Sequence, residues 1–281
     1  MIRSFFISDL HGHIDRYEKL ILHIRLHKPK LVFFGGDLLP HGMNRHFSSD
    51  FTEDFLFFHF KNLMEEMGED YPRIYLILGN DDPRTEEMRF IGLGETGVWH
   101  YLHERKDDYN GFTFYGYSNV PPTPFRLKDW ERYDVSRYVD PGCIPPDQGF
   151  HTMEPAVDLA FATILDELKQ LTGDGMMDKS VFLFHSPPYK TYFDRAGLDG
   201  IMVDHTPMDV NVGSIAIMRF IEERQPWLTM HGHIHESSHI TGHWYQQFGQ
   251  TNSYSAAWDG PELALIDFDL EDPSKARRHI I

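Results

Sequence analysis

The stretch IRSFFISDLHGH at residues 2–13 decides the fold class of this chain. It begins with an apolar run rich in β-forming side chains and then stops at a polar cluster. Residues 14–26 follow with apolar side chains at helical spacing, so the segment reads as strand, loop and helix. The same order recurs with a strand at 31–37, a helix at 50–67 and a strand at 73–81. This alternation predicts an α/β fold in which helices cover a parallel sheet.

The rest of the chain continues this alternation less regularly. Helices are predicted at 154–171 and 213–224, and strands at 112–119, 179–185, 227–235, 244–248 and 261–270. Residues 120–150 contain six prolines among aromatic and charged residues, which predicts a long loop or insertion. Because no internal repeat or polar linker interrupts the chain, we predict one domain over residues 1–281, with an insertion at about 120–150.

The composition excludes several classes of protein. The chain has 281 residues, 26 basic and 43 acidic side chains, and a formal net charge of −17. Such an acidic surface repels nucleic-acid backbones and anionic lipids, so long nucleic acids and membranes are not expected partners. Cys143 is the only cysteine, no apolar run is long enough to span a membrane, and the first residues lack the pattern of a signal peptide. We expect a soluble cytoplasmic protein, and its oligomeric state stays open.

Side chains of the kind that bind metals follow five of the apolar runs. They are Asp9 with His11, Asp37, Asn80, His185, and His233 with His235. The carboxyl ends of parallel strands share one edge of a sheet, where loops from distant positions meet. Residues two apart in an extended segment also point to the same side, which makes each of the two pairs a two-pronged ligand. The sequence therefore predicts one site at this edge.

The predicted ligand set indicates which ions the site would hold. Its three oxygen donors and four imidazoles, without a thiolate, exceed what one tetrahedral ion requires. They suit two adjacent divalent ions that share a bridging carboxylate. Manganese, iron and zinc all accept such mixed ligands, and the choice among them stays open.

These blocks resemble the calcineurin-like metallophosphoesterase superfamily, whose pattern is D-x-H, G-D, G-N-H-[DE], a lone H and G-H-x-H. Here they stand, in the same order, as Asp9-Leu10-His11, Gly36-Asp37, Gly79-Asn80-Asp81-Asp82, His185 and Gly232-His233-Ile234-His235. The resemblance implies a four-layered α/β/β/α sandwich. It also implies that Asp9, His11 and His235 hold one ion, that Asn80, His185 and His233 hold the other, and that Asp37 bridges both.

The chain departs from this family pattern at Asp81, where most active members have a histidine that assists the leaving group. An aspartate beside two cations stays ionised, so we expect little acid catalysis from it. His13 or His41, each just past a ligand block, is our candidate for a partial replacement. The alternative for His13 is a loop histidine that orients Asp9 or Asp37. For His41 an ordinary turn residue is the preferred interpretation.

Several further residues have two interpretations each. Arg84 either meets a substrate phosphate or pairs with Glu87 on a helix. The insertion either covers the site or forms a structural lobe or an oligomer contact. Asn252 either touches the site or is a turn residue, and the turn residue is the preferred interpretation. The remaining histidines near apolar patches, His100, His103, His239 and His243, are assigned to the surface or to packing.

The resemblance implies a phosphoesterase that uses two divalent metal ions and a metal-bridging hydroxide on a small phosphorylated substrate. Asp37, Asn80, Asp81 and His13 are the candidate catalytic residues. We predict hydrolysis of phosphodiesters in preference to phosphomonoesters, because some members without the histidine resemble phosphodiesterases. The alternative is a non-catalytic scaffold, as in one retromer subunit of this fold, where we would expect eroded ligands. A protein phosphatase is disfavoured because the block GDLLPHG at 36–42 differs from the GDYVDRG of those enzymes.

Overall fold

The computed structural model describes residues 1–40 and 50–281, which form two six-stranded sheets and their covering helices. The first sheet has the order β14-β13-β1-β2-β3-β4. Its strands are β1 (Arg3–Ile7), β2 (Leu31–Gly35), β3 (Arg73–Ile77), β4 (His100–Tyr101), β13 (Ala264–Asp269) and β14 (Asp272–Ile280). β1 to β4 pair in parallel, whereas β13 and β14 add antiparallel strands beside β1. The sheet is therefore mixed, with its parallel part made by the first strands of the chain.

The second sheet has the order β11-β12-β10-β7-β6-β5. Its strands are β5 (Arg105–Tyr109), β6 (Phe112–Tyr117), β7 (Ser180–Phe184), β10 (Leu228–His231), β11 (Tyr245–Phe248) and β12 (Thr251–Ser255). The four central strands are parallel, and β5 and β11 are antiparallel edge strands. A separate hairpin pairs β8 (Met202–Val203) with β9 (Thr206–Pro207).

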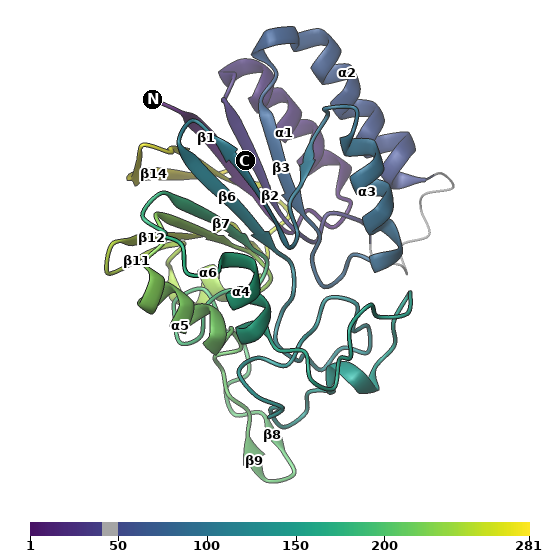
Figure 1. The fold of residues 1–281 in the computed structure, drawn as a ribbon, viewed down its shortest axis with the longest axis vertical. Helices are drawn as coiled ribbons and strands as arrows, with labels where there is room; N and C mark the ends of the chain where they lie inside the picture. The colour runs from purple at the N-terminus through teal and green to yellow at the C-terminus, as the bar shows by residue number, and fades with distance from the viewer. Residues whose placement is uncertain (41–49) are drawn as a thin grey trace.

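Helices cover the outer face of each sheet (Figure 1). The first sheet carries α1 (Ile14–His27), α2 (Phe58–Met67) and α3 (Glu87–Gly94), and a π-helix (Phe51–Phe57) leads into α2. The second sheet carries α4 (Ile164–Thr172) and α5 (Ile215–Arg224), and the short α6 (Ser237–Thr241) follows β10. Short 3₁₀ turns lie at Gly68–Asp70, Arg84–Glu86 and Pro146–Gln148.

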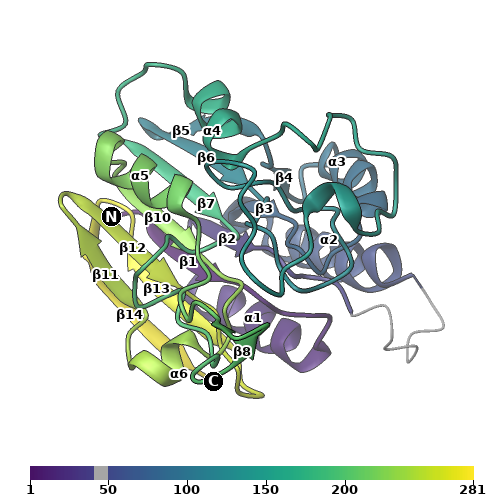
Figure 2. The same cartoon turned by 90° about the horizontal axis from the view of Figure 1, so that it is seen from below.

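Side-chain alternation along the strands produces four layers. In β1, Phe5 and Ile7 pack against the helices, while Phe6 points into the core between the two sheets. The β7 strand does the same on the other side, since Val181 and Leu183 face the first sheet and Phe182 faces α4 and α5. The predicted α/β/β/α sandwich is confirmed (Figure 2).

Three details of the predicted elements are wrong. The sheets are mixed and not purely parallel, because the periodicity of a strand does not show whether its neighbour runs parallel or antiparallel. The helix expected at 154–171 begins only at Ile164, after Thr163 caps it by accepting the N–H of Asp166. Asn252 lies in β12, where it accepts a hydrogen bond from Tyr245, and is not a turn residue.

Residues 120–163 form a lobe with little regular structure, beside the end of the sandwich that carries the hairpin (Figure 1). An ion pair lies inside it. Lys128 and Glu131 are almost completely buried, and their side chains are 2.6 Å apart. Thr123 completes the cluster, since its carbonyl oxygen accepts from Lys128 and its N–H donates to Glu131. These contacts favour the structural interpretation of the insertion.

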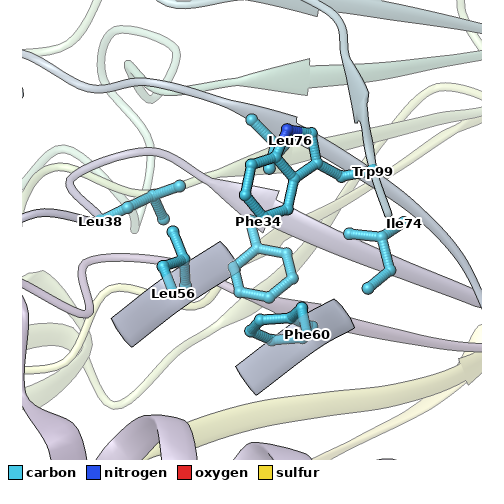
Figure 3. Close-up of a pocket in the computed structure, with 7 residues that line it drawn as sticks. All are labelled: Phe34, Leu38, Leu56, Phe60, Ile74, Leu76 and Trp99. Carbon is cyan, nitrogen blue, oxygen red and sulfur yellow. The ribbon is translucent and has the colours of Figure 1, made fainter. Parts of the chain in front are cut away.

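A small apolar cavity lies between the first sheet and α2 (Figure 3). It measures about 10 Å³ and is lined by Phe34, Leu38, Leu56, Phe60, Ile74, Leu76 and Trp99. Because the lining has no polar partner for water, we expect the cavity to be dry.

Shortening Ile74 is expected to enlarge this cavity at a modest cost. Ile74→Val should lower the free energy of unfolding by about 0.5–1.5 kcal/mol, because a buried methyl group is lost and the packed sheet cannot close the space. Urea denaturation measures the change. Ile201→Val removes the same group from an exposed side chain and should stay within about 0.5 kcal/mol of the wild type. Equal effects of the two substitutions would contradict the prediction.

Candidate metal centre

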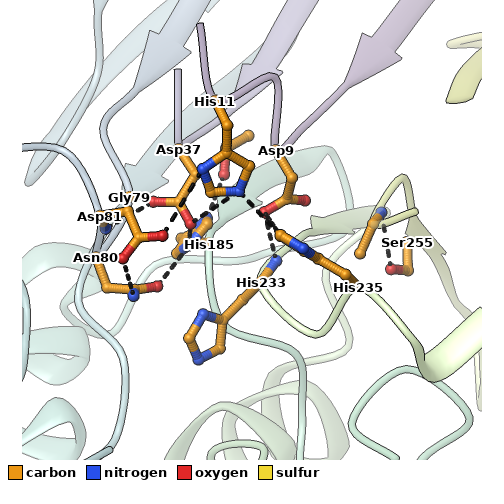
Figure 4. Close-up of polar contacts among 12 residues, drawn as sticks. Asp9, His11, Asp37, Gly79, Asn80, Asp81, His185, His233, His235 and Ser255 are labelled. Atoms are coloured by element: carbon orange, nitrogen blue, oxygen red, sulfur yellow. Dashed lines mark hydrogen bonds and ion pairs between the residues drawn. The ribbon is translucent and has the colours of Figure 1, made fainter. Parts of the chain in front are cut away.

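All seven residues of the predicted ligand set lie together at the carboxyl ends of five parallel strands (Figure 4). β1, β2 and β3 of the first sheet lead to Asp9, His11, Asp37 and Asn80. β7 and β10 of the second sheet lead to His185, His233 and His235. The centre therefore spans the seam between the two sheets.

The ligand atoms form two groups that share one carboxylate. Asp9, His11, Asp37 and His235 each offer an atom within 4.8 Å of the others, and Asp37, His185 and His233 do the same. Asn80 adjoins the second group, since its Oδ1 lies 3.0 Å from His185 Nε2. This partition is the one that the family resemblance implies.

The main chain adopts unusual conformations at this centre. Asp9, His11, Asp37 and His233 all have positive φ, between 45° and 76°, which non-glycine residues rarely adopt. Strained backbone conformations of this kind are common at functional sites, where the packing of the surrounding residues maintains them. Gly79 allows the loops to touch, because a Cβ there would lie 2.2 Å from Asp37 Oδ1.

Charge pairing dominates the electrostatics of the buried ligands. Burial is the largest single influence on Asp37 and would raise its pKa. The charge and hydrogen bond of His185, 3.3 Å away, together with the charge of His11 and the N–H of Asp81, outweigh burial and lower that pKa. Burial likewise opposes the imidazolium form of His185, yet Asp37 raises its pKa. For Asp9, the hydrogen bond and charge of His235 overcome burial and lower the pKa to about 2. Burial and the neighbouring His185 lower the pKa of His233 to about 3.

The residues fit a metal centre on two observations of their own. Asp9 Oδ2 is buried without a hydrogen-bond partner among the described residues, which is costly unless something else binds it. His185 Nδ1 lies 2.8 Å from the Gly35 carbonyl, which fixes Nδ1 as the protonated nitrogen and turns the Nε2 lone pair toward the group. Carboxylate, amide and imidazole donors suit manganese, iron or zinc.

Asp81 lies at the open side of the centre, with about a quarter of its side chain exposed. Its Oδ2 is 3.7 Å from His11 Nδ1, and its N–H donates to Asp37 Oδ1 at 2.8 Å. His13 is the exposed N-cap residue of α1. His41 lies outside the described residues.

Arg84 pairs with Glu87, 3.2 Å away, so the helical pairing is the interpretation that the contacts favour. Lys190 lies on the loop after β7 with its ammonium over the Tyr189 ring.

Sequence reasoning missed the importance of Asp82. This fully buried carboxylate accepts hydrogen bonds from the N–H groups of Leu38, Leu39 and Gly79. Burial and then the charge of Asp37 raise its pKa, against the N–H groups that lower it. The signal available in the sequence was the pair of aspartates, Asp81 and Asp82, that follows Asn80. Only Asp81 departs from the family pattern, so Asp82 received no attention.

The apparent metal affinity of this centre is expected to rise with pH through the neutral range and up to about pH 10, where His185 loses its proton. Asp37 and Asp9 raise the pKa values of His185 and His235 in the metal-free protein, and an imidazolium cannot bind a cation. A metal ion must therefore displace protons at the lower pH. Calorimetric titration with Mn²⁺ in two buffers of different ionisation enthalpy measures the protons released. An affinity that is independent of pH, with no proton release, would refute this expectation.

None of the helices in the described part of the chain combines the length and apolar character that a membrane span requires.

Comparisons with known proteins place these features in context. The protein-family model described as calcineurin-like phosphoesterase matches residues 2–237 of this chain. None of the curated proteins is significantly similar to the sequence. One crystal structure has a TM-score of 0.62 at 15% identity, and the match covers 99% of this chain and 98% of the other. The crystal structure of TT1561 of Thermus thermophilus has a TM-score of 0.57 at 15% identity, with coverage of 99% and 98%. At this identity both likenesses concern the fold.

Proposed function

Because the chain belongs to the calcineurin-like phosphoesterase family, we propose that it is a hydrolase of phosphodiesters that depends on two divalent metal ions. The observation that carries the proposal is the position of Asp37, which belongs to both groups of ligand atoms. A carboxylate shared in this way is what two adjacent cations require.

Three residues would hold each ion in addition to Asp37. Asp9, His11 and His235 belong to one group, and Asn80, His185 and His233 to the other. When bound, a pair of divalent ions polarises a phosphoryl oxygen and lowers the pKa of a water molecule. The protein fixes the ligands by burial and hydrogen bonds, and His235, about one-third exposed, marks the side open to substrate.

The preference for diesters rests on Asp81. Its N–H is bound to Asp37, and its side chain lies beside His11, so a carboxylate stands where a proton donor is usual in the family. Near cations this carboxylate stays ionised and has no proton to give. Substrates whose leaving group needs little protonation are therefore the better candidates. Diesters are favoured among them because some members of the family without this histidine resemble phosphodiesterases.

The net charge of −17 limits the size of the substrate. Two bound divalent ions would bring four positive charges to one place on an otherwise acidic protein. A small phosphorylated molecule can reach that place, whereas a long polyanion would meet the repelling surface around it. We therefore propose a small phosphodiester as the substrate.

Reconstitution of the metal-free protein tests the proposal. Protein loaded with manganese, iron or zinc is assayed with a chromogenic phosphodiester and with the matching monoester. Faster turnover of the diester, lost on chelation, is expected. Two bound ions without hydrolysis of either ester would instead support the non-catalytic scaffold, and faster turnover of the monoester would overturn the diester preference.

His13 offers a separate test of the proton donor. If this exposed histidine partly replaces the missing acid, His13→Ala should lower kcat/KM about 10-fold for diesters with poor leaving groups and leave good ones unchanged. The effect is smaller than the roughly 10²–10⁴-fold of a fully placed acid, because the side chain is exposed. Diesters of phenols of graded pKa measure the difference. Equal losses for all leaving groups would exclude this role.

A further inference from the structure

The lobe holds the turn that follows the Asn80 ligand. The indole of Trp130 is fully buried and donates its N–H to the carbonyl oxygen of Asp82, at 2.7 Å. The guanidinium of Arg84 lies over the same ring, 4.5 Å from its centre. Asp129, next in the chain, accepts the backbone N–H of Arg84 at 2.8 Å. Two of these three contacts are therefore hydrogen bonds to the main chain of the turn.

The same turn joins two ligand loops. The side chain of Asp82 accepts the N–H groups of Leu38 and Leu39 at 2.8–3.0 Å, directly after Asp37. It also accepts the N–H of Gly79 at 2.9 Å, directly before Asn80. Asp82 thus ties the loop after β2 to the loop after β3, and its own position is fixed from the lobe.

The lobe is also anchored to two helices that cover the second sheet. Arg132 donates to Glu167 of α4 at 2.7 Å. Asp134 accepts from the hydroxyl of Ser214 and from the N–H of Ile215, at the first turn of α5. The lobe therefore links a ligand loop of the first sheet to the helices that cover the second sheet.

The loops after β2 and β3 are closely packed where Asp82 connects them. A Cβ on Gly79 would lie 2.2 Å from Asp37 Oδ1 and 2.7 Å from the His185 ring. A displacement of the 82–84 turn would therefore move Asn80 relative to both of those ligands. Partners that orient metal ligands in this way commonly change metal affinity when they are altered.

We propose that Trp130 is a positioning residue for the metal centre. Its indole N–H fixes the main chain of Asp82, and through it the spacing of Asp37 and Asn80. The lobe is then part of the machinery that retains the metal ions, in addition to any contact that it makes with substrate. The metal-affinity part of this inference rests on the proposed function, whereas the control of the loops after β2 and β3 does not.

The test compares two tryptophans in the same chemical setting. Trp130→Phe removes the N–H that reaches Asp82 and keeps an aromatic ring in place. Trp99→Phe is the matched control, because Trp99 is also buried and donates to a backbone carbonyl, that of Phe90, at 2.8 Å. Each full-length variant is measured for Mn²⁺ affinity by calorimetry, for amide hydrogen exchange of the metal-free protein, and for thermal unfolding.

We expect Trp130→Phe to weaken Mn²⁺ binding about 10- to 100-fold and to speed exchange at the amides of Leu39 and Gly79, which donate to Asp82. Trp99→Phe should lower the melting temperature without either effect. Exchange at those amides that matches the wild type, or an equal loss of Mn²⁺ affinity in both variants, would overturn the inference. So would faster exchange with unchanged Mn²⁺ affinity.

Two further measurements separate a failure of the proposed function, or of the variant to fold, from a failure of this inference. If the wild type binds no Mn²⁺, the proposed function fails, and the exchange data alone decide whether Trp130 controls the loops. If Trp130→Phe does not fold, Asp129→Asn weakens the second contact to the same turn. Asp134→Asn, which alters a contact of the lobe with α5 and none with that turn, is its control. Loss of Mn²⁺ affinity in Asp129→Asn alone supports the inference, and equal affinities in the two variants overturn it.

Discussion

Replacing Asp37 by asparagine is expected to abolish metal retention and to lower kcat/KM by more than about 100-fold. Asp37 is the residue common to both ligand groups, and its carboxylate lies 3.3 Å from His185 and 3.8 Å from His11. Asparagine keeps the size but not the charge that two cations would share. Loss of an outer partner of a ligand typically costs 10- to 100-fold, so loss of the shared ligand should cost more. Metal content after gel filtration and steady-state kinetics measure the two effects.

Asp70→Asn provides the matched control for this substitution. Asp70 forms an exposed ion pair with Lys28 and lies just before β3, at the opposite end of that strand from Asn80. Its loss of charge should leave metal content and kcat/KM unchanged. Activity of Asp37→Asn close to that of the wild type would refute the assignment of the centre.

Replacing Lys128 by methionine is expected to lower the free energy of unfolding by about 3–5 kcal/mol. Lys128 is completely buried and donates to Glu131 at 2.6 Å, so its removal leaves a carboxylate inside the lobe without a cation. The cost of that unpaired charge exceeds the cost of losing the packing alone. Urea denaturation monitored by tryptophan fluorescence measures it.

A double substitution separates the charge from the packing. Lys128→Met combined with Glu131→Leu removes both charges and should recover most of the lost stability, because the desolvation cost disappears with them. Lys28→Met, in the exposed pair with Asp70, should cost less than about 1 kcal/mol. A single variant at Lys128 that is as stable as the wild type would contradict the prediction.

The sequence was most informative where a strand runs into a loop. Asp9, Asp37 and His185 each follow an apolar run within two residues, and a parallel sheet brings such ends to one edge. The carboxyl ends of parallel strands lie at one edge whatever the order of the strands in the sheet. All seven predicted ligands could therefore be chosen without knowing which strands are neighbours. The four-layered sandwich itself came from the family resemblance.

Long-range pairing could not be predicted in this way. β13 and β14 join the first sheet beside β1, more than 250 residues away in the sequence. The periodicity of residues 261–270 showed a strand but not its partner or direction. The short strands β4 and β5 were missed because β4 has only two residues and β5 carries charged side chains at an edge of the sheet.

The lobe was ambiguous for a different reason. Lys128 and Glu131 are three residues apart, a spacing that is common on exposed surfaces, and nothing local shows that both are buried. The bond from Trp130 to Asp82 joins segments 48 residues apart. Such contacts depend on how the lobe packs, so the sequence alone left its role open.

The seam between the sheets has one further consequence for the architecture. Each ligand group takes residues from both sheets: His11 faces His235 across 224 residues of chain, and Asn80 faces His185 across 105. An ion bound by either pair is a cross-link that closes a very long loop, and such closures restrict the unfolded chain most. With Cys143 as its only cysteine, the chain can form no internal disulfide. Ions bound at the two candidate ligand groups would supply such cross-links instead.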